Sequence, residues 1–346
     1  MQEGLADAKI ESLGCLQRYF QICSKNRQVD LLPLLRGLER DLKSDLFTVI
    51  SPNPVVAFLG ASEESAWVLK ALVDNGVRIE LAVTKEPKRR SRGSSASANS
   101  VEEVARAAGI EVSYDISTLK SKVFELAIVV AFGLIIPSEY IERWPFLNIH
   151  YSLLPRWRGA APVERAILAG DESTGVALME IVEALDAGKI YDLVEVKIDD
   201  YESSAALRSR LTNIGIERLL AALKVGGSFF ADAVEQSGEV TYAKKIKKEE
   251  FQIGKDTSVS QLLRMVRVAR PFGVSSEFGR VSISDCSEVS LDKDEIASTP
   301  VGVLRGDTLR LCDGAVVVGN LQVEGKRAMA LNEFRRGNHK DIDFVS

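Results

Sequence analysis

Short apolar runs alternate with amphipathic segments through the middle of the chain. Residues 55–60 and 79–83 are compact apolar runs, and Ala66, Leu69 and Val73 recur at helical spacing between them. Continuous apolar runs are typical of buried parallel strands, and a repeat of three or four residues indicates an amphipathic helix. This strand–helix–strand order predicts a doubly wound α/β domain.

The same alternation continues toward the C-terminus. It predicts helices at residues 101–108, 163–169 and 205–223, and strands at residues 111–114, 126–132 and 175–181. The run at 126–132 is the most apolar of them, so we expect it at the centre of the sheet.

The pattern changes at about residue 238. A short helix at 259–268 is followed by short strands at 281–284, 301–304, 309–312 and 315–321. Short strands with frequent turns predict a small β-barrel of the OB type, a platform that often binds nucleic acids. We therefore expect a helical N-terminal extension over 1–53, a catalytic domain over 54–238 and a C-terminal domain over 239–346.

Composition narrows the class of protein. The chain has 346 residues, 46% hydrophobic and 27% charged, and its formal net charge of −5 argues against a generally basic nucleic-acid binder. Residues 240–346 nevertheless hold 17 Lys and Arg against 15 Asp and Glu. The four cysteines show neither zinc-finger nor disulfide spacing, and no apolar run reaches the length of a membrane span. We expect a cytoplasmic monomer with reduced thiols and no metal.

A nicotinamide or flavin site is not favoured. Gly60 ends the first strand without the second and third glycines of the dinucleotide-binding turn.

Asn148, His150 and Asp186 are the residues suited to acyl transfer. Asn148 and His150 lie two apart at the end of a predicted strand, so their side chains point the same way. An amide and an imidazole can stabilise a tetrahedral oxyanion, and a carboxylate beside the imidazole can assist proton transfer. A lone histidine at a strand end and an aspartate in a turn can equally be structural. No serine or cysteine is paired with a base, so covalent catalysis is not indicated.

A basic segment follows the second strand. Four of five consecutive positions are basic, namely Lys88, Arg89, Arg90 and Arg92. The segment is either a solvated surface loop or an arm that contacts RNA phosphates.

Several motifs together resemble the 10-formyltetrahydrofolate-dependent formyltransferases. They are the stretch from Asn148 to Pro162, Asn-Ile-His-Tyr-Ser-Leu-Leu-Pro-Arg-Trp-Arg-Gly-Ala-Ala-Pro, the Leu-Asp-Ala-Gly turn at 185–188, the strand and loop at 129–137, and Val-Thr-Tyr-Ala-Lys-Lys-Ile at 240–246. The longer stretch resembles the branch that acts on methionyl-tRNA, and the resemblance covers residues 55–336.

The resemblance implies a Rossmann-like formyltransferase domain followed by an OB-like domain that grips tRNA. It implies formyl transfer from 10-formyltetrahydrofolate to the α-amino group of methionyl-initiator tRNA, with Asn148, His150 and Asp186 as the catalytic residues. The folate would contact Phe132, Gly133, Leu134, Ile135, Ile136, Pro137, Ser152, Leu153, Leu154 and Pro155. The tRNA would contact Lys88, Arg89, Arg90, Arg92, Lys244, Lys245, Lys247 and Lys248.

The sequence departs from the family pattern in three places. Tyr151 stands where the family usually has glycine or proline, the basic loop is shorter, and residues 1–53 have no counterpart. Two alternatives stay open: a formyltransferase acting on an amino sugar or glycinamide ribonucleotide, and a tRNA-binding relative without catalysis.

Overall fold

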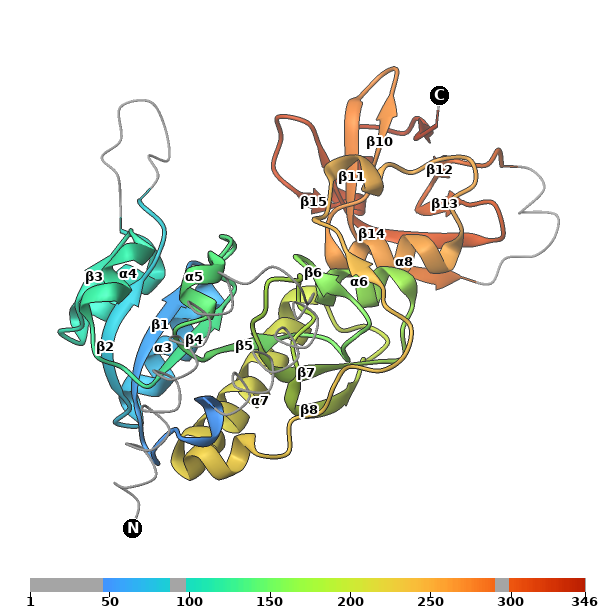
Figure 1. The fold of residues 1–346 in the computed structure, drawn as a ribbon. Helices are drawn as coiled ribbons and strands as arrows, with labels where there is room; N and C mark the ends of the chain where they lie inside the picture. The colour runs from blue at the N-terminus through green and yellow to red at the C-terminus, as the bar shows by residue number, and fades with distance from the viewer. Residues whose placement is uncertain (1–45, 88–97, 290–298, 346) are drawn as a thin grey trace, which may run out of the picture. The chain divides into compact units, whose positions relative to one another are not determined.

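The computed structural model describes residues 46–87, 98–289 and 299–345, and most of the predicted 1–53 extension lies outside these ranges. Figure 1 shows two regions of regular structure within residues 46–345, an α/β region and a C-terminal β region. Each is built around its own sheet and hydrophobic cluster.

The α/β region has a mixed sheet of seven strands in the order β3-β2-β1-β4-β5-β7-β8. Its first five strands in this order are parallel, and β5–β7 and β7–β8 pair antiparallel. The strands are β1 (Val55–Gly60), β2 (Arg78–Val83), β3 (Val112–Ser113), β4 (Leu126–Val130), β5 (Phe146–His150), β7 (Ser173–Glu180) and β8 (Ile190–Lys197). The most apolar run, β4, is the central strand, as predicted, whereas β8 was not predicted.

Helices cover both faces of this sheet. They are α3 (Glu63–Asp74), α4 (Ser100–Ala107), α5 (Ser138–Ile141), α6 (Pro162–Ala169) and α7 (Ser204–Val225), with 3-10 turns η1 (Ile116–Ser121) and η2 (Gly226–Phe230). Alternate residues of β1 enter different clusters, because successive strand side chains point to opposite faces. Val56 and Phe58 pack with α3, α4 and α7, whereas Ala57 and Leu59 pack with η1 and α5.

The predicted strand at 126–132 ends two residues early. Ala131 and Gly133 have φ values of 42° and 63°, which an extended strand does not allow. The chain therefore turns away from the sheet directly after Val130, beside the end of β5.

The C-terminal region is an antiparallel, barrel-like sheet in the order β10-β11-β14-β13-β12-β16, with β15 paired to β14. Its strands are β10 (Phe272–Ser275), β11 (Gly279–Val289), β12 (Val303–Arg305), β13 (Thr308–Arg310), β14 (Ala315–Val323), β15 (Met329–Ala330) and β16 (Ile342–Asp343). Helices α8 (Val259–Val268) and α10 (Leu331–Arg335) contribute to its core, and η3 (Lys248–Phe251) precedes it. A small barrel-like domain was predicted here, although β10, β15 and β16 were not.

A two-stranded parallel ribbon joins distant parts of the chain. Its strands, β6 (Arg158–Gly159) and β9 (Tyr242–Ala243), lie 84 residues apart in sequence and pair residue by residue. Among the described residues, no helix is long and apolar enough to cross a membrane.

The contact between α7 and β5 depends on a glycine. Gly215 is buried in α7, and a Cβ atom there would lie 2.9 Å from Ile149 Cγ2. Helix and strand can approach this closely because residue 215 has no side chain.

We predict that Gly215→Val lowers the free energy of unfolding by about 1 to 3 kcal/mol, because the added atoms overpack this contact. Urea unfolding followed by circular dichroism measures the change. Ala221→Val, at an exposed position of the same helix, controls for the β-branched side chain. Equal losses in both variants would contradict the close-packing argument.

Candidate active site

His150 occupies the last position of β5 and is buried, with 5% of its surface exposed. Its Nε2 lies 3.0 Å from the carbonyl oxygen of Trp157. Because a carbonyl oxygen only accepts, Nε2 must carry the hydrogen and donate. In the neutral ring, Nδ1 then keeps its lone pair and is the nitrogen that can accept a proton.

Asp186 faces that nitrogen. It lies in the turn between β7 and β8, and its Oδ2 is 3.7 Å from His150 Nδ1. The same Oδ2 accepts a 2.7 Å hydrogen bond from the Gly159 N–H. The distance to Nδ1 exceeds that of a direct hydrogen bond. A proton donor such as an amine or a water would therefore be needed to connect Asp186 Oδ2 with His150 Nδ1.

Asn148 lies on β5 two residues before His150 and is half-buried. Its register partners are Val129 on β4 and Met179 on β7. The strand alternation directs Asn148 and His150 to the same face, opposite to Ile149. The structure thus brings the Asn148 position, His150 and Asp186 to one end of β5.

Asp171 holds the loop after β5 through Arg156 and Trp157. Trp157 has φ of 64°, an uncommon conformation for a bulky residue. Its indole N–H donates to Asp171 Oδ2 at 2.7 Å, and Asp171 also accepts two hydrogen bonds from Arg156. Asp171 therefore raises the pKa of the Arg156 guanidinium and fixes the loop.

The predicted folate wall after β4 divides into exposed and buried residues. Phe132 and Ile136 are buried in the cluster on the α5 face of the sheet. Leu134 and Ile135 are 53% and 92% exposed. Gly133 and Pro137, on either side of residues 134–136, are also exposed. The exposed pair offers apolar surface next to the ends of β4 and β5.

The predicted folate residues of the next loop are mostly buried. Ser152 is fully buried and its hydroxyl donates to the Arg156 carbonyl at 2.6 Å. Leu154 packs on Ala177 and Met179 of β7. Leu153 is half-buried, and Pro155 is buried. A folate contact from this loop stays a prediction.

Tyr151 points away from His150. Its ring joins the cluster on the α7 face of the sheet, and its hydroxyl lies 3.2 Å from the Thr212 hydroxyl on α7. The unusual aromatic residue after His150 thus belongs to the core and leaves the candidate site unobstructed.

The basic residues predicted to contact tRNA fall in two groups. Those at Lys88, Arg89, Arg90 and Arg92 lie outside the described residues. The second group, Lys244, Lys245, Lys247 and Lys248, is exposed just after β9. Arg165 of α6 holds the main chain there, donating to the carbonyls of Lys244 and Lys245.

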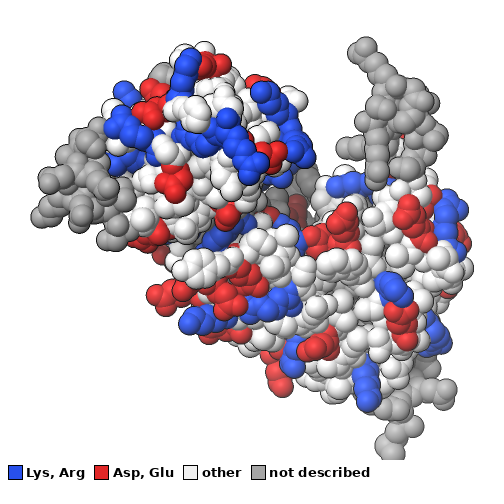
Figure 2. Space-filling model, turned by 180° about the vertical axis from the view of Figure 1, so that it is seen from behind, with Lys and Arg blue, Asp and Glu red and all other residues white. Residues whose placement is uncertain are grey.

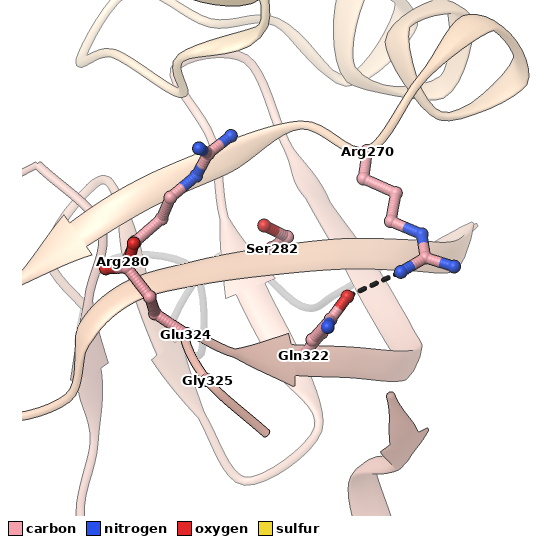
Figure 3. Close-up of a pocket in the computed structure, with 6 residues that line it drawn as sticks. All are labelled: Arg270, Arg280, Ser282, Gln322, Glu324 and Gly325. Carbon is pink, nitrogen blue, oxygen red and sulfur yellow. Dashed lines mark hydrogen bonds between the residues drawn. The ribbon is translucent and has the colours of Figure 1, made fainter. Parts of the chain in front are cut away.

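A shallow pocket of about 300 Å³ lies on the barrel-like sheet (Figure 3). Figure 3 shows Arg270 bonded to Gln322, with Arg280 and Glu324 at the other end. The Arg280 guanidinium lies over the Phe272 ring, 3.7 Å from its centroid. None of the lining residues belongs to the predicted set. Within the described ranges, no group of His, Cys, Asp and Glu is arranged to hold a metal ion.

Two further residues contact the site. Gln236 donates to the carbonyls of Asp186 and Gly188, and the Thr241 hydroxyl accepts from the Trp157 N–H. Thr241 lies in the motif at 240–246 without having been assigned a role, and no motif of the sequence analysis contains Gln236.

Comparison with known proteins identifies the class of protein. Residues 54–223 match the formyl transferase family model. In solved structures, the fold is similar to HypX from Aquifex aeolicus in complex with tetrahydrofolic acid, with a TM-score of 0.55 and 18% identity, covering 82% of this chain and 48% of that one. It is also similar to an N-formyltransferase from Helicobacter canadensis in complex with folinic acid and dTDP-3-aminofucose, with a TM-score of 0.56 and 13% identity, covering 76% and 98%.

Sequence similarity identifies the branch. The chain is 34% identical over 300 residues to the methionyl-tRNA formyltransferase of Parvibaculum lavamentivorans, covering 82% of this chain and 96% of that one. It is 36% identical over 307 residues to that of a Caulobacter species, with the same coverage. The chain therefore belongs to the methionyl-tRNA formyltransferase family, as its motifs predicted.

The burial of Tyr151 has a consequence for alkaline stability. Burial raises the pKa of Tyr151 to about 12, whereas a tyrosine in an unfolded chain ionises near 10. The stability that this shift contributes is present below pH 10. It is lost at about 1.4 kcal/mol per pH unit as the pH rises from 10 toward 12.

We predict that Tyr151→Phe removes this loss. Urea unfolding at pH 8, 10 and 11.5 should show a smaller alkaline decline for Tyr151→Phe than for the unmodified chain. Tyr201→Phe, at a position 92% exposed, serves as the control. A decline that is the same in all three proteins would contradict the assignment of Tyr151 to the core.

Proposed function

We propose that this protein transfers the formyl group of 10-formyltetrahydrofolate to the α-amino group of methionyl-initiator tRNA. The observation that carries the proposal is the pairing of His150 Nδ1 with Asp186 at the end of β5. It occurs in a chain that matches 96% of the length of a methionyl-tRNA formyltransferase.

The chemistry requires one bond to form and one to break. The neutral α-amino nitrogen attacks the formyl carbon, and a tetrahedral intermediate with a negatively charged oxygen forms. The carbon–N10 bond then breaks as N10 takes up a proton, and the amine loses one. The overall reaction therefore exchanges the formyl group for a proton.

Each of the three residues has a role in these steps. The Asn148 amide supplies an N–H donor to the oxyanion. His150 accepts the proton of the attacking amine at Nδ1, because its Nε2 is committed to the Trp157 carbonyl. The Asp186 carboxylate lies 3.7 Å from Nδ1 and is placed to orient the group that gives its proton to the imidazole.

The exposed side chains Leu134 and Ile135 support a folate site beside β5. A pterin ring is flat, with polar edges and faces that stack on apolar groups, and the two side chains present apolar surface next to the ends of β4 and β5. The folate is a co-substrate that leaves after each turnover.

Basic residues support the tRNA side of the proposal. Lys and Arg side chains gather on the visible face of the barrel-like region, interspersed with fewer acidic ones (Figure 2). The exposed lysines 244–248 lead into this region, and Arg270 and Arg280 line its pocket. We propose that these groups contact tRNA phosphates.

We predict that His150→Ala and Asp186→Asn each lower the turnover number about 100-fold or more, because proton transfer loses its acceptor or its partner. Purified protein, 10-formyltetrahydrofolate and charged initiator tRNA provide the assay. His339→Ala, at an exposed position, is the matched control. Turnover near that of the unmodified enzyme in either site variant would show that the residues are misassigned.

The same assay separates the alternatives. Formyl transfer to an amino-sugar nucleotide or to glycinamide ribonucleotide but not to methionyl-tRNA would overturn the proposed substrate. Binding of tRNA without transfer to any acceptor would indicate a non-catalytic relative.

We also predict that the double variant Lys247→Gln/Lys248→Gln binds initiator tRNA more weakly and with a shallower salt dependence. Each lost phosphate contact should reduce the slope of log K against log salt by roughly one unit. Filter binding between low and physiological salt measures the slope. Lys70→Gln/Lys224→Gln, at exposed positions on α3 and α7, is the charge-matched control. An unchanged slope would remove these lysines from the tRNA contact.

A further inference from the structure

We propose that Gln236 and Thr241 are positioning residues for the His150–Asp186 pair. Both lie in residues 234–243, which we call the joining segment because it connects the α/β region to the barrel-like region. The inference depends on the proposed function only in that one of its tests measures formyl transfer. The contacts themselves are independent of the substrate.

The joining segment is anchored to the α/β region at both ends. At its start, Val234 and Ile190 exchange two main-chain hydrogen bonds of 2.8 Å. At its end, β9 pairs with β6, directly beside the loop that follows His150. The side chains between these anchors are therefore held at fixed positions over the candidate site.

Thr241 acts on His150 through Trp157. Its hydroxyl accepts a 2.8 Å hydrogen bond from the Trp157 N–H, and its carbonyl accepts one of 2.9 Å from the Arg158 N–H. Trp157 has φ of 64°, a strained conformation that a bulky residue keeps only where its surroundings enforce it. The Thr241 hydroxyl holds the peptide unit before Trp157, and the Thr241 carbonyl holds the unit after it, which carries the Trp157 carbonyl, so the two contacts fix Trp157 from both sides. The carbonyl of Trp157 in turn receives the His150 Nε2 hydrogen.

This chain of contacts determines which nitrogen of His150 is basic. While the Trp157 carbonyl stays in place, Nε2 holds the proton and Nδ1 faces Asp186 with its lone pair. If the Trp157 carbonyl moves, the ring loses the partner that selects this tautomer. Thr241 thus has an indirect effect on the general base.

Gln236 acts on Asp186. Its side-chain Nε2 donates to the Asp186 carbonyl at 2.9 Å and to the Gly188 carbonyl at 2.8 Å. Its Oε1 accepts two hydrogen bonds from Arg158, at 3.0 and 2.6 Å. Because guanidinium groups only donate and carbonyls only accept, this network fixes the orientation of the amide.

The Asp186 turn needs such support. Asp186 has φ of 45°, and a Cβ at Gly188 would lie 2.0 Å from the Glu180 carbonyl oxygen, so the turn is tight and strained. Gln236 bridges two of its carbonyls, while the Gly159 N–H holds the Asp186 carboxylate. Since Gly159 belongs to β6, which pairs with β9, both supports of Asp186 depend on the joining segment.

The decisive substitutions separate hydrogen bonding from size. Gln236→Glu keeps the acceptor for Arg158 but replaces the donor with an oxygen that faces two carbonyls. Thr241→Val keeps the shape and removes the hydroxyl, whereas Thr241→Ser restores it. We expect Gln236→Glu and Thr241→Val to lower kcat about 10- to 100-fold, as small misplacements of catalytic groups do. The KM for methionyl-tRNA should change less than about threefold, and Thr241→Ser should recover most of the activity.

Two controls match these substitutions. Gln261→Glu introduces the same charge at an exposed position of α8, and Thr308→Val removes an exposed hydroxyl of the barrel-like sheet. Both should leave kcat within about twofold of the unmodified enzyme. Circular dichroism and thermal unfolding confirm that each variant is folded.

A second readout does not depend on activity. The chain has two histidines, His150 and the exposed His339, so isotope-labelled histidine gives two imidazole signals by NMR. Gln236→Glu and Thr241→Val should shift the His150 signal and leave the His339 signal in place.

The outcomes are distinguishable. Unchanged kcat and an unchanged His150 signal in both folded variants would overturn the proposal. A rise in KM with unchanged kcat would also overturn it, since it would indicate a substrate-binding role. If the unmodified protein transferred no formyl group to methionyl-tRNA, the proposed function would fail, and the NMR measurement would still decide whether these residues position His150.

Discussion

The hydrogen bond from the Gly159 N–H to Asp186 Oδ2 joins the two halves of the candidate active site. One half is the loop that leaves β5, and the other is the turn between β7 and β8. This bond holds the carboxylate opposite the His150 ring, since the Oδ2–Nδ1 distance of 3.7 Å is too long for a direct hydrogen bond between the two side chains. The rest of the structure places Gly159 so that its N–H points at Asp186.

The position of Gly159 is fixed because β6 pairs with β9. This pairing requires glycine at residue 159, since a Cβ atom there would lie 2.9 Å from the Ala243 carbonyl oxygen. The strand that leads to the barrel-like region therefore also braces the loop of the candidate active site. The same stretch of chain continues into the exposed lysines 244–248. In the proposed function, the lysines that meet tRNA therefore follow directly along the chain from the strand that braces the loop of the candidate active site.

Much of the fold followed from local patterns. Residues 55–60 and 259–268 matched β1 and α8 residue for residue, because compact apolar runs and helical repeats directly reflect burial. The predicted strand at 126–132 was too long. Its last apolar residue, Phe132, packs into the hydrophobic cluster on the α5 face after the chain has left the sheet. Strand β8 was not predicted because it carries charged residues on its exposed side. Its antiparallel pairing with β7 is what identifies the segment as a strand.

The sequence by itself determined the family, the two regions and the candidates Asn148, His150 and Asp186, because motifs and strand alternation are local properties of the chain. Only the tertiary structure decided that Tyr151 turns into the core, that Nε2 of His150 is committed to Trp157, and that Gln236 and Thr241 contact the site. The contacts of Tyr151, Gln236 and Thr241 join residues 50 to 84 positions apart, and the contact between His150 and Trp157 depends on the fold of the loop between them. The physical reason is that hydrogen bonds and packing select partners by position in space, which spacing along the chain does not specify.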